Sequence, residues 1–162
     1  MKFFDNIIDG TPGKDVLTGK RSDDLIAGFG GNDILIGGAG DDLLNGGSSK
    51  DVLRGGKGND LLDGGAGNDK LFGGEGADQF LLKRGKGKDT IADFKDGQDS
   101  FLLADGLEFE ELTITRRFGQ TEIASPKGQA SFAGITATDE VLASLIGVQP
   151  NVIGLEDFTT LV

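Results

Sequence analysis

Residues 10–81 repeat one pattern of glycine, aspartate and apolar residues with a strict period of nine. Eight consecutive repeats place glycine at position 1, aspartate at position 6 and a large apolar residue at position 8, as Gly37–Asn45 (GGAGDDLLN) shows. A random glycine-rich tract would not keep three columns in phase over this length. The period therefore predicts a repeat architecture.

Each repeat is long enough for one tight turn and one short strand. Glycine at positions 1, 2 and 4 permits turn conformations with positive φ, and the triplet around the apolar residue suits a very short strand. Two repeats make an 18-residue coil, and stacked coils would pair each strand in parallel with the strand 18 residues later. We therefore predict an all-β fold: a parallel β-roll, or β-solenoid of 18-residue coils, with a C-terminal β-rich cap.

The composition of the chain changes near residue 81, where glycine becomes sparse and phenylalanine and β-branched residues become frequent. This change predicts an N-terminal cap at residues 1–9, a roll at 10–81 and a β-rich flank at 82–162. Candidates to cover the first coil are Phe3, Phe4, Ile7 and Ile8. Alternating apolar residues predict strands near Gln79–Lys83, Thr90–Phe94, Ser100–Leu103, Leu112–Arg117, Thr121–Ala124 and Ser131–Ile135, whereas Thr138–Ile146 suits a helix or a strand.

Stacking the coils would gather the aspartates into two ladders, one along each edge of the roll. The first ladder contains Asp15, Asp33, Asp51 and Asp69, and the second contains Asp24, Asp42, Asp60 and Asp78. The net charge of −11 makes cations better partners than nucleic acid or an anionic membrane surface. Oxygen ligands in a chain without histidine or cysteine suit Ca²⁺ better than zinc, copper or Mg²⁺.

Several classes of function are disfavoured by what the sequence lacks. Without histidine or cysteine there can be no zinc-protease motif, Ser-His triad, thiol nucleophile or disulfide. No apolar stretch is long enough to span a bilayer, and acidic residues interrupt the N-terminus, so we expect no N-terminal export signal. A glycosidase-like pair of carboxylates among Asp105, Glu108, Glu110 and Glu111 stays open, but nothing fixes its spacing, so we do not expect an enzyme.

The repeats resemble the calcium-binding nonapeptide repeats of the repeats-in-toxin (RTX) family, most closely in GGAGDDLLN, GGKGNDLLD, GGAGNDKLF and GGEGADQFL. The resemblance implies a parallel β-roll in which each ion lies between successive turns of one edge, bound by an aspartate from each turn and by turn carbonyls. The implied pairs are Asp15 with Asp33, Asp24 with Asp42, Asp33 with Asp51, Asp42 with Asp60, Asp51 with Asp69, and Asp60 with Asp78. The implied carbonyl positions are Gly38, Gly40, Gly47, Gly56, Gly58, Gly65, Gly67, Gly74 and Gly76.

Some turns depart from the pattern. Thr11 and Pro12 alter the first turn, Lys20 and Ser22 the second, Phe29 the third and Ser49 the fifth, so we expect the weakest ion sites at the first two turns. In the broken repeat RGKGKDTIA, Asp89 either pairs with Asp69 or marks the end of the roll. Asp93, Asp96 and Asp99 lack the nine-residue phase and are interpreted as turn residues, with an extra ion site as the alternative.

For function, the resemblance implies a secreted calcium-binding module that folds on binding Ca²⁺ outside the cell. It also implies a C-terminal signal for type I secretion machinery, with which LEDFTTLV at residues 155–162 is compatible, although a last strand explains that segment equally. The alternative is a structural or adhesive extracellular surface protein or spacer. Its contact face would be the outward apolar column Val16, Leu25, Ile34, Leu43, Val52 and Leu61, which also simply favours strand geometry. The sequence identifies no protein or glycan partner.

Overall fold

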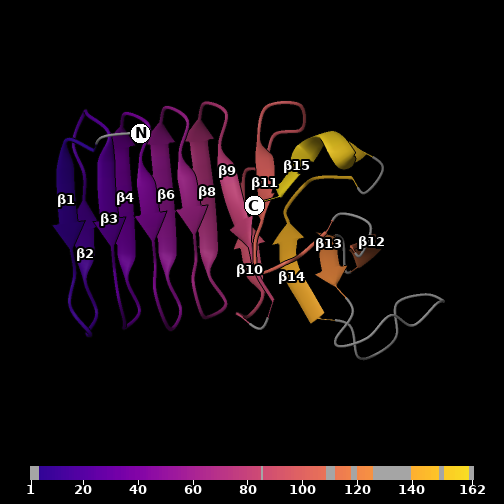
Figure 1. Ribbon diagram of the computed structural model, residues 1–162, viewed down its shortest axis with the longest axis horizontal. Coiled ribbons are helices and arrows are strands. Elements are labelled where there is room, and N and C mark those ends of the chain that lie inside the picture. The colour runs from indigo at the N-terminus through magenta and orange to yellow at the C-terminus, as the bar shows by residue number, and fades with distance from the viewer. Residues whose placement is uncertain are drawn as a thin grey trace.

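The chain folds into a stack of coils built from two facing β-sheets, as the computed structural model in Figure 1 shows. The structure describes residues 4–84, 86–108, 112–117, 120–125, 140–149 and 152–160. Successive strands alternate between the two sheets, so each coil contributes one short strand to each sheet.

The first sheet contains seven strands in the order β1-β3-β5-β7-β9-β11-β15, and every neighbouring pair is parallel. Its strands are β1 (Asn6–Asp9), β3 (Asp24–Ala27), β5 (Leu43–Asn45), β7 (Leu61–Asp63), β9 (Gln79–Leu82), β11 (Ser100–Leu103) and β15 (Phe158–Thr160). The brevity of these strands follows from the glycine-rich turns that begin and end each repeat.

The second sheet contains eight strands in the order β2-β4-β6-β8-β10-β14-β13-β12. Its strands are β2 (Val16–Thr18), β4 (Ile34–Ala39), β6 (Val52–Lys57), β8 (Lys70–Glu75), β10 (Asp89–Ile91), β14 (Glu140–Leu145), β13 (Gln120–Ser125) and β12 (Thr113–Arg117). The strands from β2 to β14 are parallel, whereas β14, β13 and β12 pair antiparallel.

The strand register confirms the predicted 18-residue coil. Leu17 pairs with Leu35, and Leu25 pairs with Leu43. Beyond the nonapeptides the step lengthens, because Thr90 pairs with Lys70, 20 residues earlier, and Ser100 pairs with Gln79, 21 residues earlier. Both sheets therefore continue across residue 81, and the extra residues are accommodated in turns.

The core is the narrow space between the two sheets. As expected, Leu35, Leu53 and Leu71 are fully buried on one wall, and Ile26, Leu44, Leu62 and Phe80 on the other. Towards the C-terminus the interior becomes aromatic. The ring of Phe101 stacks on those of Phe94 and Phe158, with ring centroids 4.6 and 5.0 Å apart.

The predicted strands of the flank are confirmed in β9 to β13, and Thr138–Ile146 contains a strand, β14. The predicted strand Ser131–Ile135 lies outside the described residues. Within residues 155–160, the 3-10 turn η3 (Leu155–Asp157) precedes β15, which pairs with β11. No helix of the described part of the chain is long and apolar enough to cross a membrane.

The N-terminal residues form part of the ladder. Residues 6–9, expected in a cap, form strand β1, and Ile8 packs partly buried against the core. Ile7 is 68% exposed, and Phe4 lines a pocket together with Leu43 and Leu61. Phe3 lies outside the described residues.

Candidate metal centre

The turns form two edges, each carrying one aspartate ladder. Edge 1 consists of residues 10–15, 28–33, 46–51, 64–69 and 83–89, and edge 2 consists of residues 19–24, 37–42, 55–60, 73–78 and 92–99. Each ladder aspartate donates its backbone N–H to Oδ1 of the aspartate 18 residues later, over 2.7–3.0 Å. All six aspartate pairs implied by the sequence are thus adjacent.

Both ladders continue one step beyond the nonapeptides. The backbone N–H of Asp69 donates to Asp89 Oδ1, and that of Asp78 donates to Asp99 Oδ1, each over 3.1 Å. Asp89 therefore pairs with Asp69, whereas the place of Asp99 was missed because it follows Asp78 by 21 residues. The signal that could have found Asp99 is its Asp-x-apolar triplet, which ends at the buried Phe101.

Asp93 has a different place from Asp99. Its Oδ1 and Oδ2 accept the backbone N–H groups of Gly73 and Gly74, over 2.9 and 3.1 Å. Asp93 therefore fastens one turn of edge 2 to the next, which agrees with the interpretation of this residue as a turn former.

Turn carbonyls face along the edge towards the next turn. A Cβ atom placed on Gly40 would lie 2.7 Å from the Ser22 carbonyl oxygen, because position 4 of each turn faces position 4 of the turn before it. Positive φ at this position makes glycine the natural choice, and Gly40 has a φ of 120°. All the glycines implied as carbonyl ligands have positive φ: Gly38, Gly40, Gly47, Gly56, Gly58, Gly65, Gly67, Gly74 and Gly76.

The irregular turns divide into two kinds. Phe29 and Ser49 replace glycine but keep positive φ, at 67° and 85°. The first two turns have no residue with positive φ, and their aspartates are satisfied within the turn. Oδ2 of Asp15 accepts the backbone N–H of Thr11 over 2.6 Å, and Oδ2 of Asp24 accepts that of Lys20 over 2.6 Å.

In later turns the outer carboxylate oxygen is buried without a donor. Among the described residues, Oδ2 accepts no hydrogen bond in Asp33, Asp51, Asp60, Asp69 and Asp78. A buried acceptor without a partner is costly, and a buried charge more so. These orphaned oxygens, beside outward-facing carbonyls, fit a hard cation with 6–8 oxygen ligands such as Ca²⁺.

The pKa values of the ladder carboxyls respond to the same burial. Burial raises the pKa of Asp51 and Asp78 to about 6, and that of Asp60 and Asp89 to about 7. Neighbouring carboxylates raise these pKa values further, as Asp42 and Asp78 do for Asp60. Among the described residues no three acidic side chains converge on one point, so turn carbonyls must supply much of any ligand set.

A second ladder, which the sequence reasoning missed, runs beside each aspartate ladder at position 5. The Oδ1 atoms of Asp23, Asn32, Asp41, Asn59 and Asn68 accept the backbone N–H of the matching residue in the next coil, over 2.8–3.0 Å. The signal was present, because five of the eight repeats carry Asp or Asn at position 5. These side chains satisfy turn N–H groups and so hold the turns in register.

Comparison with protein families identifies the repeat. The family described as RTX calcium-binding nonapeptide repeat (4 copies) matches residues 5–44 and 45–80. This chain is an RTX calcium-binding nonapeptide repeat protein. Its roll is a calcium-binding module, and the ladders described above are the RTX turns of this molecule. No curated protein matches the sequence significantly.

Two solved structures are similar to the RTX protein. The solution structure of the AlgE6R3 subunit from the Azotobacter vinelandii mannuronan C5-epimerase is 23% identical, with a TM-score of 0.51, covering 93% of this chain and 80% of that one. The crystal structure of the extracellular lipase LipA from Serratia marcescens is 16% identical, with a TM-score of 0.42, covering 98% of this chain and 40% of that one. At these identities the likeness concerns the fold.

Proposed function

We propose that this RTX protein is a secreted calcium-binding module that folds on binding Ca²⁺ outside the cell. The observation that carries the proposal is the set of buried Oδ2 atoms without donors, on carboxyls that lie between turns with outward-facing carbonyls. The folded chain presents oxygen ligands at fixed positions, whereas the unfolded chain does not. Ca²⁺ therefore binds the folded state preferentially and stabilises it.

The residues of the chain divide this work between them. Asp33, Asp51, Asp60 and Asp78 would hold the ion, and bound Ca²⁺ would supply the positive charge that buried carboxylates lack. The glycine turns bring carbonyls within reach, and the position-5 side chains keep successive turns aligned. At low cytosolic Ca²⁺ the acidic repeats would stay unfolded, and at the ~10⁻⁴–10⁻³ M range of extracellular modules they would fold. Residues 155–162 would then direct export through type I secretion machinery.

The alternative function is a structural or adhesive spacer on the same calcium-stabilised roll. It is favoured by apolar residues on the outer faces of the sheets, where the Val16 side chain is 65% exposed and Leu25, Leu43 and Leu61 are half-buried. We propose no catalytic role. Asp105 and Glu108 lie in a loop after β11, and Glu110 and Glu111 lie outside the described residues.

Far-ultraviolet circular dichroism tests the proposal, because the chain has no tryptophan or tyrosine to report folding by fluorescence. In EDTA we expect a largely coil spectrum, and millimolar Ca²⁺ should convert it to a β spectrum. Equal Mg²⁺ serves as the control and should be much less effective, since Mg²⁺ needs a stricter octahedron. A spectrum that is β-rich in EDTA and unchanged by Ca²⁺ would refute calcium-driven folding.

A further inference from the structure

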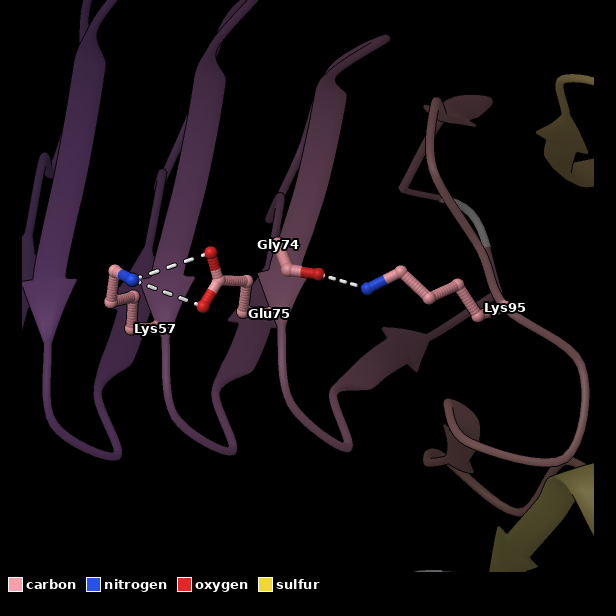
Figure 2. Close-up of polar contacts among 4 residues, drawn as sticks. All are labelled: Lys57, Gly74, Glu75 and Lys95. Carbon is pink, nitrogen blue, oxygen red and sulfur yellow. Dashed lines mark hydrogen bonds and ion pairs between the residues drawn. The ribbon is translucent and has the colours of Figure 1, made fainter.

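The last turn of edge 2 differs from the earlier turns in how it meets its neighbour. Residues 92–99 follow the turn at 73–78 with the longer register of 21 residues, and they carry Lys95 and Gln98. Figure 2 shows the Lys95 side chain reaching back to the preceding coil. Its Nζ donates to the Gly74 carbonyl oxygen, and Gln98 Nε2 donates to that of Gly76.

The two carbonyls that these side chains bind are the ones that face the next turn. In earlier coils the carbonyls of Gly38 and Gly40 point towards Gly56 and Gly58, and those of Gly56 and Gly58 point towards Gly74 and Gly76. Gly74 and Gly76 continue the same two rows. The carbonyls that an ion in the last gap would use therefore already accept side-chain N–H donors.

The charges in this gap also differ from those of earlier gaps. The Lys95 ammonium lowers the pKa of Asp78 and Asp99, opposing the effect of burial on both carboxyls. The backbone N–H of Lys95 donates to Asp99 Oδ2 over 2.8 Å. Asp99 thus has a donor on each oxygen, one from Asp78 and one from Lys95, and a positive charge lies nearby.

Lys57, one coil earlier on the same edge, behaves differently. Its Nζ lies 3.1 and 3.3 Å from the two carboxylate oxygens of Glu75, and the side chains are 67% and 75% exposed (Figure 2). Such an exposed pair contributes little to stability. Lys57 therefore offers a matched control: a lysine close by in the fold that contacts a surface carboxylate and no turn carbonyl in its own ion pair.

We propose that the Lys95 ammonium takes the place of a calcium ion in the last gap of edge 2. The tethered cation binds the Gly74 carbonyl and neutralises Asp78 and Asp99, while Gln98 binds the Gly76 carbonyl. This gap then closes without metal, and residues 73–103 form an end on which calcium-filled coils can stack. The inference rests on the proposed calcium binding of the remaining gaps.

Counting bound ions tests the inference directly. Equilibrium dialysis against saturating Ca²⁺, with metal analysis, would compare the wild-type protein with Lys95→Gln, Lys95→Arg and Lys57→Gln. We expect Lys95→Gln to bind one more ion than wild type, because two carboxylates lose their counter-charge and a carbonyl is freed. Lys95→Arg and Lys57→Gln should bind the wild-type number.

A second comparison does not depend on Lys95→Gln folding. In the wild-type background, Asp99→Asn should leave the ion count unchanged, whereas Asp60→Asn should lower it. An equal, nonzero count in wild type and a folded Lys95→Gln protein, or a lower count in Asp99→Asn, would overturn this inference alone. No bound ions in wild type would overturn the proposed function and this inference with it.

Discussion

Replacing Asp60 by Asn removes one charge from the middle of the edge 2 ladder and changes little else. Asp60 is 1% exposed, its Oδ1 accepts the Asp42 N–H over 2.8 Å, and its Oδ2 accepts no hydrogen bond. Asn keeps the size and the Oδ1 acceptor, so the backbone ladder can persist. What Asn cannot provide is a charged oxygen ligand, and Asp60 borders two gaps, the one towards Asp42 and the one towards Asp78.

The size of the effect follows from ligand linkage. A site filled at about 100 times its dissociation constant stabilises the folded state by about 2.7 kcal/mol. Such filling corresponds to about 10 mM Ca²⁺ and a dissociation constant of about 10⁻⁴ M. Loss of both sites next to Asp60 would remove about 5 kcal/mol, which is comparable to the whole stability of a small domain. Asp15→Asn should cost far less, because Thr11 already satisfies Asp15 and only one gap adjoins it.

The assay is urea unfolding at about 10 mM Ca²⁺, a setting taken from the extracellular affinity range, followed by circular dichroism. Asp41→Asn serves as the control for net charge: Asp41 lies beside Asp60 on edge 2 but uses Oδ1 to accept the Asn59 N–H, which Asn also can do. Asp60→Asn should shift the calcium midpoint for folding upward by at least tenfold. Equal losses in Asp60→Asn, Asp41→Asn and Asp15→Asn would refute the site register.

Calcium affinity should fall as the pH drops from 8 to 6, because the raised pKa values of about 7 for Asp60 and about 6 for Asp51 let protons compete with Ca²⁺. In EDTA the sign reverses: raised folded pKa values make the metal-free roll more stable as pH falls through them, which a pH series by circular dichroism would check. Phe101→Ala should cost about 3–5 kcal/mol in urea unfolding with Ca²⁺, against a much smaller loss for the half-buried Phe72→Ala.

The regular part of this molecule could be predicted because the sequence repeats it. Each coil solves the same local problem with the same residues, so the phase of Asp33 and Leu35 gives the sheet, the core wall and the ladder together. Only the fold of the turns at Thr11 and Lys20 needed the structure. There, the loss of positive φ lets the backbone satisfy Asp15 and Asp24 directly.

The C-terminal end could not be predicted with the same precision, because the nine-residue phase ends before the sheets do. Pairing continues through Thr90 and Ser100 at longer steps, and a step is invisible when turn length varies and only the Asp-x-apolar triplet persists. The contact of Lys95 with Gly74 arises from this longer turn. The position-5 ladder was visible in the sequence, but Asp and Asn in glycine-rich turns are common for many reasons.

The two ends of the stack are unlike each other. One end finishes in the antiparallel strands β12 to β14 and in the rings of Phe101 and Phe158, whereas β1 and β2 are the outermost strands at the other end. There Ile8 and Leu17 are only partly covered. The molecule consequently has a direction of growth: an engineered chain could be lengthened by inserting whole coils ahead of Asn6, each prolonging both sheets by one strand. The opposite terminus admits no such elongation, since reversed strands there break the translational repeat.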